Sequence, residues 1–176
     1  MKTVIIGGVA GGASAAARLR RLDESAEIVL LERGEYVSFA NCGLPYYIGG
    51  VIPDQDDLTL QTPERFHAHF RIDVRTLHEA VSIDPQRKTV AVRDIRRDCV
   101  YEESYDSLVL SPGAEPIRPK IDGIDSPAVF SLRNIPDTLK IKAYIESEKP
   151  VSAVVVGGGY IGVEMAENLK KAEYTL

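Results

Sequence analysis

Cys42 is the residue of this chain whose surroundings most strongly indicate chemistry. It lies in the segment 36–50, YVSFANCGLPYYIGG, among small and turn-forming residues just before a short apolar run. A helix that starts near Gly43 would stabilise a thiolate at Cys42, and Ser38 and Asn41 could orient the thiolate or a substrate by hydrogen bonds. These residue types would suit a reactive thiol. The alternative is a cysteine that only fills space in the core.

A glycine-rich turn near the N-terminus indicates a second kind of chemistry. The β-branched run 3–6 ends at GGVAGG, residues 7–12, and the helical pattern SAAARLRRL follows. Gly7 would allow the tight turn, the N–H groups at the helix start would hold a pyrophosphate, and Gly12 would let the helix lie close to the strand. A second strand, 27–31, would place Glu32 where a dinucleotide ribose could donate to it. Val9 replaces the middle glycine of this fingerprint, so an ordinary strand-to-helix turn stays open as an alternative.

The same pattern returns about 150 residues later with every fingerprint glycine present. The run SAVVV, 152–156, leads into GGGYIG, 157–162, and a helix is predicted from Val163 to about Ala172. Two dinucleotide fingerprints in one chain indicate electron transfer between two bound dinucleotides. Residues 173–176 look like the opening of the next strand, and the acid or arginine that would distinguish NAD from NADP should follow that strand.

The order of these patterns predicts an α/β fold with two nucleotide-binding domains. Residues 1–150 are expected to form the first domain, and residues 151–176 the incomplete beginning of the second. Between the fingerprints, strand-like runs predict a small antiparallel layer with a hairpin turn at 84–87. These runs are 71–76, 79–84, 88–95, 99–104 and 107–111. Helices are expected to begin after Thr62 and Asn134, and Ser111-Pro112-Gly113 predicts a turn that a cofactor could approach closely.

Composition excludes several other classes of function. The 176 residues carry a formal net charge of −5, which argues against a nucleic-acid partner, and no apolar run is long enough to span a membrane. A cytoplasmic protein is therefore expected. Two cysteines give no disulfide framework, and the three histidines have no metal-ligand spacing, so no metal site is predicted. The arginines of the first helix, Arg18, Arg20 and Arg21, form either a solvated face or a site for an anionic substrate.

With both fingerprints, the segment SFANCGLPYY at 38–47 and the Ser111-Pro112-Gly113 turn in this order, the chain resembles the N-terminal part of the pyridine nucleotide-disulfide oxidoreductases. Within that family it is most similar to the coenzyme A disulfide reductases. The resemblance implies a Rossmann-like, three-layer ββα domain that binds FAD. Glutathione-reductase-like members carry a CxxxxC pair, whereas Tyr47 stands five residues after Cys42 here. The resemblance therefore implies a single catalytic cysteine, Cys42, that lies against the flavin and cycles between a thiolate and a mixed disulfide.

The resemblance also implies roles for other residues. NAD(P)H would bind at Gly157, Gly159, Tyr160, Ile161 and Gly162, and a coenzyme A-type disulfide or persulfide would bind at Ser14, Arg18, Arg21, Ser38 and Asn41. The full-length protein is expected to be a homodimer. FAD would contact Gly7, Gly8, Val9, Ala10, Gly11, Gly12, Glu32, Arg33, Cys42, Val81 through its backbone, Ser111, Pro112, Gly113 and Arg133.

Three alternatives stay open at this stage. An NADH oxidase or peroxidase would use Cys42 through a sulfenic acid. A persulfide reductase shares the motif around Cys42. The chain could also be an inert nucleotide-binding module. Because the family's second flavin segment and its dimerisation domain lie beyond residue 176, this chain alone is expected to bind FAD weakly or not at all and to be inactive.

Overall fold

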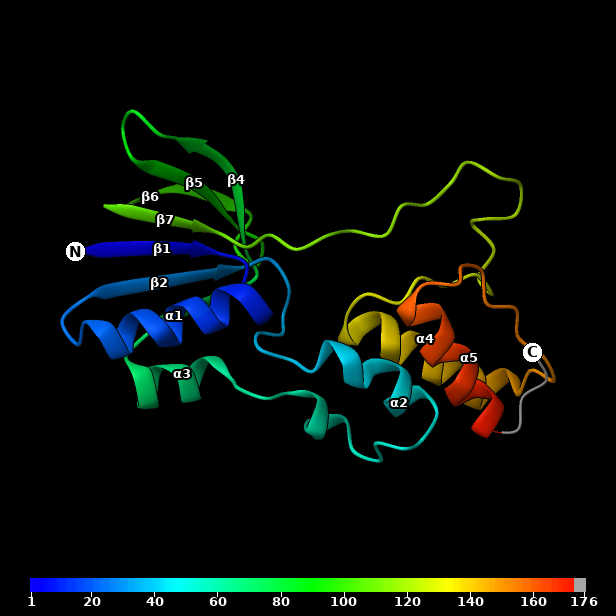
Figure 1. Cartoon of the computed structure of the whole chain (residues 1–176). Helices are drawn as coiled ribbons and strands as arrows, with labels where there is room; N and C mark the ends of the chain where they lie inside the picture. The colour runs from blue at the N-terminus through cyan, green and yellow to red at the C-terminus, as the bar shows by residue number, and fades with distance from the viewer. Residues whose placement is uncertain (173–176) are drawn as a thin grey trace. The chain divides into compact units, whose positions relative to one another are not determined.

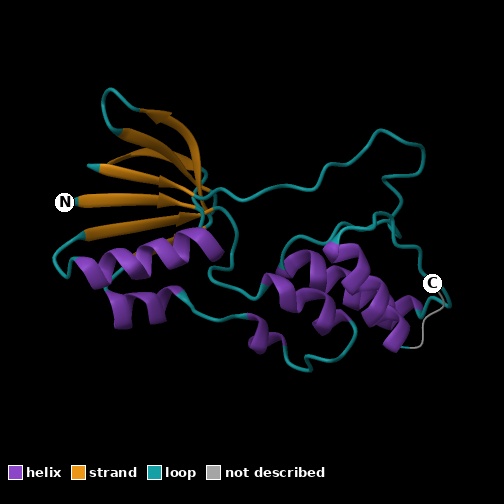
Figure 2. Cartoon of the chain, viewed as in Figure 1, coloured by secondary structure: helices purple, strands orange, loops and turns teal. Residues whose placement is uncertain are grey.

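The computed structural model describes residues 1–172, which group into two compact units. The first unit combines Met1–Phe39 with Thr59–Gly113, and the second combines Ala40–Leu58 with Ala114–Leu176. Figure 1 colours the chain by residue number and Figure 2 by secondary structure, and strands β1 to β7 lie within the residues of the first unit. These units are groups of contacts within this chain, so the boundary expected at residue 150 stays a prediction.

A parallel sheet forms the centre of the first unit. Its four strands are β1 (Lys2–Ile6), β2 (Glu27–Glu32), β3 (Asp73–Thr76) and β7 (Ser107–Leu110), in the order β3-β2-β1-β7. All three neighbouring pairs are parallel. The helix α1 (Ala10–Leu22) makes the crossover from β1 to β2. The central strands β1 and β2 are nearly continuous apolar runs, as expected where both faces of a parallel sheet are covered.

Alternate side chains of β1 and β2 enter two different cores. Ile5, Ile28 and Leu30 face α1 and α3 (Pro63–Phe70) and pack with Ala13, Ala16 and Phe66. Val4, Val29 and Leu31 face the other way and pack against Val90 and Val92. These two valines belong to an antiparallel sheet of β4 (His78–Asp84), β5 (Thr89–Asp94) and β6 (Cys99–Ser104), which lies on the opposite face of the parallel sheet (Figure 1). The predicted three-layer α/β fold is confirmed.

The predicted antiparallel layer is smaller than expected. All five strand-like runs form strands, but 71–76 supplies β3 and 107–111 supplies β7, and both join the parallel sheet. Alternating apolar and polar residues identify a strand but not the strand that pairs with it, because long-range packing decides the pairing. The hairpin at 84–87 is confirmed, and Asp84 Oδ1 accepts hydrogen bonds from the N–H groups of Gln86 and Arg87.

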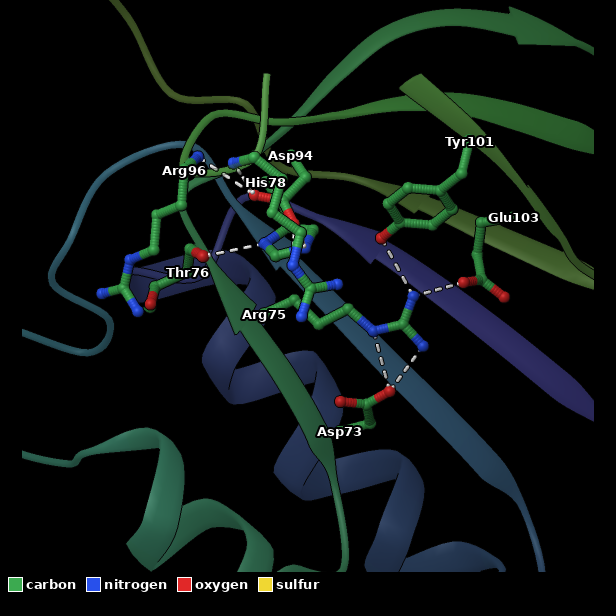
Figure 3. A network of polar contacts seen from close by, with 9 residues as sticks. Asp73, Arg75, Thr76, His78, Asp94, Arg96, Tyr101 and Glu103 are labelled. Atoms are coloured by element: carbon green, nitrogen blue, oxygen red, sulfur yellow. Dashed lines mark hydrogen bonds and ion pairs between the residues drawn. The ribbon is translucent and has the colours of Figure 1, made fainter. Parts of the chain in front are cut away.

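A polar network joins the two sheets (Figure 3). Arg75 of β3 donates to Asp73 at 2.9 and 2.6 Å, to the Tyr101 hydroxyl at 3.0 Å, and to Glu103 of β6. Lys2 of β1 contacts the other Glu103 oxygen at 2.5 Å, and this pair raises the pKa of Lys2. Burial tends to raise the pKa of Glu103, but hydrogen bonds from Lys2 and Arg75 outweigh it and lower that pKa. The network ties β1 and β3 to β6.

The side chain of Arg20 holds the ends of two helices together. It is buried and donates to the carbonyls of Phe70 (2.6 Å), Arg71 (3.0 Å), Asp23 (3.1 Å) and Glu24 (2.7 Å). These carbonyls lie at or just beyond the C-terminal ends of α1 and α3, where helices lack internal donors. Arg20 is therefore a structural residue.

The second unit is helical. It contains the 3-10 turns η1 (Asn41–Gly43) and η2 (Gln55–Leu58) and the helices α2 (Leu44–Ile48), α4 (Ile135–Glu148) and α5 (Tyr160–Lys171). Ile48, Ile141, Met165 and Leu169 form its core. The helix starts predicted after Thr62 and Asn134 are confirmed, because Thr62 Oγ1 accepts from the Arg65 N–H and Asn134 Oδ1 accepts from the Asp137 N–H.

Two expectations for the second fingerprint are wrong. Residues 152–156 do not form a strand, and Val154 and Val156 are 88% and 94% exposed, because no strand among the described residues lies beside them. The helix begins at Tyr160, three residues before the predicted Val163. The predicted opening of a further strand, 173–176, lies outside the described residues. No helix in the described part of the chain has the length and apolarity to cross a membrane.

Candidate functional site

The first glycine-rich turn lies at the point where the parallel sheet changes its direction of growth. After β1 the chain adds β2 and β3 on one side of β1, and β7 pairs on the other side. In open α/β sheets, ligands bind outside the carboxyl ends of the strands at this switch point. Both predicted loops leave these ends, because Gly7 follows β1 and Ser111 follows β7. The Ser111 N–H donates to Ile6 O at 2.8 Å, which brings the two loops together.

Two glycines of this turn are required by close backbone contacts. Gly7 has φ +94°, and a Cβ on it would lie 1.9 Å from Ser111 O. A Cβ on Gly12 would lie 1.8 Å from Gly7 O. Side chains at either position would therefore force the turn, the helix and the Ser111 loop apart.

The start of α1 offers donors for an anion. Val9 precedes the helix and provides no side-chain hydrogen bond, and no acidic residue lies in the first turn. The N–H groups at the start of a helix have no partner within the helix, and the helix dipole favours negative charge there. This set of donors, from Ala10, Gly11 and Gly12, fits the pyrophosphate of a dinucleotide such as FAD.

Glu32 is held next to the turn by two backbone groups. Its Oε2 accepts from the Gly8 N–H and its Oε1 accepts from the Gly34 N–H, each at 2.8 Å. A carboxylate oxygen can accept more than one hydrogen bond, so both oxygens can still receive a ribose hydroxyl. Its neighbour Arg33 is exposed, and Arg33 Nη1 lies 4.0 Å from Glu79 Oε1.

Two further predicted flavin contacts belong to separate units. Val81 in the first unit is half-exposed and lies at an irregularity between β4 and β5, where the register skips from Ala80 to Ser82. Its backbone therefore has no opposite residue in the ladder, which suits a contact through the backbone. Arg133 belongs to the second unit, where its Nε donates to Ala114 O at 2.7 Å. Gly113 has φ +73°, and Pro112 lies between it and Ser111.

Cys42 lies in the 3-10 turn η1 and is exposed. The expected helix near Gly43 is present as α2, which begins at Leu44. Asn41 has a buried Oδ1 without a hydrogen-bond partner in the described part of the chain. Ser38 belongs to the first unit, where it has φ +50° and its N–H donates to Gly8 O at 2.9 Å. The structure thus places Ser38 beside the first turn and Asn41 beside Cys42.

The predicted substrate residues of α1 share one exposed face. Ser14, Arg18 and Arg21 are spaced by four and three residues, which places them on the same side of the helix, and all three are exposed. Arg20 points away from this face into its buried contacts. The choice between a solvated face and a site for an anionic substrate therefore concerns only Arg18 and Arg21.

The second fingerprint repeats the backbone geometry of the first. Gly157 has φ +110°, and a Cβ on Gly162 would lie 2.0 Å from Gly157 O. In the described part of the chain, no atom other than those of the adjacent residues lies within 4 Å of a Cβ built on Gly157, Gly158 or Gly159. The helix α5 starts after Gly159 with no capping side chain and no acid in its first turn, and Tyr160 and Ile161 are exposed. The N–H groups at the start of α5 fit the pyrophosphate of a second dinucleotide.

Sequence reasoning missed two residues that hold the Cys42 segment. Lys142 of α4 donates to Tyr47 O at 3.0 Å, and its Nζ lies 4.0 Å from the centre of the Tyr47 ring. Asn168 of α5 is fully buried against Gly49. The spacing of Met165, Asn168 and Leu169 could have placed Asn168 on the buried face of its helix, whereas nothing in the sequence marks Lys142.

The described residues contain no group of three or more His, Cys, Asp or Glu side chains that could hold a metal ion. His78, one of the three histidines considered above, instead contacts Thr76 O through Nδ1 at 2.8 Å and lies 3.7 Å from Asp94 Oδ2 (Figure 3).

Comparison with known proteins identifies the family. Residues 1–175 match the family described as pyridine nucleotide-disulphide oxidoreductase. The chain belongs to this family, whose members are flavin-dependent enzymes that use NADH or NADPH.

Among curated proteins, the chain is 45% identical over 168 residues to a coenzyme A disulfide reductase of Staphylococcus epidermidis. The matched region covers 96% of the chain and 38% of the relative. Among solved structures, it is similar to reduced Bacillus anthracis CoADR-RHD, with 56% identity, a TM-score of 0.96, and coverage of 98% of this chain and 31% of the other. An NAD-dependent persulfide reductase from A. fulgidus is 40% identical with a TM-score of 0.92, over 99% of this chain and 33% of the other. The chain thus spans about two fifths or less of these relatives.

Proposed function

We propose that this chain is the N-terminal part of an FAD-dependent NAD(P)H:disulfide oxidoreductase that works through one redox-active cysteine, Cys42. The proposed substrate is coenzyme A disulfide, or a disulfide or persulfide linked to coenzyme A. The observation that carries the proposal is an exposed Cys42 in a turn, followed five residues later by a buried Tyr47 in place of a second cysteine. The names of the similar coenzyme A disulfide and persulfide reductases support the choice of substrate.

The proposed reaction consumes one disulfide and one NAD(P)H and yields two thiols. FAD, when bound, supplies two-electron chemistry between NAD(P)H and a disulfide. The Cys42 thiolate attacks one sulfur of the substrate, the substrate S–S bond breaks, and the first thiolate leaves as a mixed disulfide forms at Cys42. Two electrons from NAD(P)H and a proton then release the second thiol and restore the Cys42 thiolate.

The remaining predicted residues would bind and orient. The start of α1 and Glu32 would hold the pyrophosphate and ribose of FAD, and the start of α5 would hold the pyrophosphate of NAD(P)H. Arg18 and Arg21, on the exposed face of α1 with Ser14, suit the phosphates of coenzyme A because a guanidinium can donate two parallel hydrogen bonds. Asn41 would donate to or accept from the reacting group beside Cys42. A cytoplasmic homodimer completes the proposal.

The visible spectrum of the purified full-length protein tests this function. We expect a flavin spectrum that gains a long-wavelength band when one equivalent of NADH or NADPH is added anaerobically, because a reduced Cys42 thiolate would interact with the flavin. The faster reductant would identify the nucleotide. A colourless protein that cannot be reconstituted with FAD would contradict the proposal.

An NADH oxidase is the second candidate, because the chain is also 35% identical to a water-forming NADH oxidase from Lactobacillus brevis, with a TM-score of 0.89. Such an enzyme would oxidise Cys42 to a sulfenic acid during turnover. Parallel assays of the full-length protein with oxygen, peroxide, coenzyme A disulfide and a persulfide would separate the candidates. Turnover with oxygen alone would favour the oxidase.

A further inference from the structure

The helix that follows Cys42 makes an unusually close contact with the helix of the second fingerprint. At the end of α2, a Cβ built on Gly49 would lie 2.7 Å from Asn168 Cβ and 3.0 Å from both Asn168 O and Asn168 Oδ1. Gly49 has φ −75°, which any residue can adopt, so the need for glycine here comes from space alone. Ile48 of α2 and Leu169 of α5 pack in the same core. The contact therefore fixes how α2 lies on α5.

Asn168 is an unexpected residue at this position. Its side chain is fully buried, and Met165 and Leu169 of the same helix belong to an apolar core with Ile48 and Ile141. The amide Nδ2 donates to Glu164 O of its own helix at 2.8 Å, but Oδ1 has no hydrogen-bond partner among residues 1–172. Leaving a buried acceptor unpaired is unfavourable, and an apolar residue of similar shape would avoid it. A residue that is costly for stability at a buried contact with the Cys42 segment indicates a role other than stability.

A displacement of α2 would be transmitted directly to Cys42. The Leu44 N–H donates to Asn41 O, and the Gly43 N–H donates to Ala40 O at 2.9 Å. A Cβ on Gly43 would meet the side chains of Ile52, Ala40 and Leu58 at 3.2–3.3 Å. Residues 40–44 thus form one hydrogen-bonded, closely packed turn that has no flexible linker between Cys42 and α2.

We propose that Asn168 and Gly49 are positioning residues for Cys42: their contact fixes α2 on α5 and so sets the direction of the thiol. The inference rests on the proposed role of Cys42. It assigns to α5, beyond its expected part in binding NAD(P)H, the task of orienting the reactive turn. Orientation matters because small displacements of a reacting group change reaction rates strongly.

Site-resolved alkylation of the full-length holoprotein tests the proposal. The reduced protein is treated with iodoacetamide under anaerobic conditions, and the rates at Cys42 and Cys99 are followed separately by peptide mass spectrometry over a range of pH. Cys99 is the internal reference because it is also exposed and lies at the start of β6 in the other unit. Iodoacetamide labels thiols whatever the physiological substrate, so the readout does not depend on disulfide reduction.

Three variants and one control are compared with the parent. Asn168→Leu replaces the unpaired amide by a side chain of similar shape, and Gly49→Ala introduces the close contact. The double variant Gly49→Ala/Asn168→Gly removes the opposing Cβ. Glu167→Ala, one residue away on the same helix and exposed, is the matched control.

We expect Asn168→Leu and Gly49→Ala each to change the Cys42 rate about threefold or more, while the Cys99 rate stays the same. The double variant should move the Cys42 rate back toward the parent although glycine in a helix lowers its melting temperature. Recovery of reactivity together with lower stability cannot arise from a purely structural role. If Gly49→Ala fails to fold, Asn168→Leu alone decides.

Parental Cys42 rates and pH profiles in Asn168→Leu and in any folded Gly49→Ala would overturn the proposal. So would a double variant no closer to the parent than Gly49→Ala. A parent whose Cys42 does not react with iodoacetamide would contradict the proposed function itself, which distinguishes the two failures.

Discussion

The two glycine-rich turns share a backbone geometry and differ in what surrounds them. In both, the first glycine has a positive φ, +94° at Gly7 and +110° at Gly157, and the last glycine lies against the carbonyl of the first. The first turn also meets Ser111 and has its Gly8 N–H bound by Glu32. By contrast, open space surrounds Gly157, Gly158 and Gly159 among the described residues.

This difference shows that the fingerprint glycines determine the turn conformation but not the contacts that support the turn. The glycines encode the turn itself, which forms even where no strand is paired in front of it. The support of the turn comes from segments far along the chain, from 107–113 and from β2 in the case of the first turn. In this chain, equivalent substitutions in the two turns should therefore have unequal effects on folding, whereas in the full-length protein each should weaken binding of its own dinucleotide.

The largest expected difference is between Gly12→Ala and Gly162→Ala. Gly12 of α1 is buried against β1, so the added methyl group would separate packed elements, and we expect a loss of about 3 kcal/mol or more of unfolding free energy together with loss of FAD from the full-length protein. Gly162→Ala in this chain should fold with little loss of unfolding free energy, and the full-length variant should retain FAD and lose reduction by NAD(P)H. Thermal unfolding, the flavin-to-protein absorbance ratio and anaerobic reduction measure these effects. Equal destabilisation by both substitutions would remove the distinction between the turns.

The next expected effect concerns the C-terminal end of the first fingerprint helix, α1. Arg20→Met should remove about 2–4 kcal/mol of stability because four carbonyls at the ends of α1 and α3 lose their donor. Arg18→Met, on the exposed face of α1, is the matched control and should leave the unfolding free energy unchanged. Denaturant unfolding of the full-length protein provides the measurement. An unchanged midpoint in Arg20→Met would show that α1 does not depend on this residue.

Glu32→Gln tests whether the acid supports the first turn. A glutamine retains one acceptor oxygen and presents an NH₂ group to either the Gly8 or the Gly34 N–H, so one hydrogen bond is lost. We expect FAD to bind the reconstituted protein about tenfold more weakly, which corresponds to the loss of one such bond. Fluorescence titration of FAD compares this variant with Glu35→Gln, an exposed neighbour. Parental affinity in Glu32→Gln would assign the ribose contact to another residue.

The smallest expected effect depends on pH. The pKa of Glu103 is lowered below its ordinary value of 4.5, so its network stabilises the folded state above that pH and loses this contribution as the pH falls through the folded-state pKa. Glu103→Gln should lower the unfolding free energy at pH 7 by about 1–2 kcal/mol and make the decline below pH 4.5 less steep. Glu167→Gln, which breaks the exposed pair with Lys171 on α5, is the control and should change neither. If the unfolding free energies of the parent and of Glu103→Gln decline equally steeply below pH 4.5, the pKa of Glu103 is not lowered in the folded state.

Local patterns predicted the elements well where one short segment contains the cause. Thr62 and Asn134 cap their helices as expected, and the hairpin at 84–87 forms where proline and aspartate favour it. The sheet to which β3 and β7 belong could not be predicted, because strands of parallel and antiparallel sheets can show the same alternating pattern of β-branched residues. The run 152–156 has the composition of a strand but no neighbouring strand among the described residues. Without a partner strand it does not form a strand, and two of its valines stay exposed.

The candidate site was predictable to a similar extent. Gly7, Gly12 and the corresponding Gly157 and Gly162 could be found from spacing, because their requirement is a backbone conformation. The roles of Arg20 and Lys142 could not, because both side chains reach carbonyls of distant segments. Exposure alone separates Arg18 and Arg21 from Arg20, although the three residues are chemically identical.

Tyr47 constrains how this kind of chain could change its chemistry during evolution. The position five residues after Cys42 belongs to the packing of the second unit, where the tyrosine ring is buried and Lys142 covers it and binds its carbonyl. A single codon change from tyrosine to cysteine would supply a second thiol but would leave the ammonium group without its ring. Conversion from a one-cysteine to a two-cysteine mechanism would therefore disturb the packing of α4 as well as that of α2.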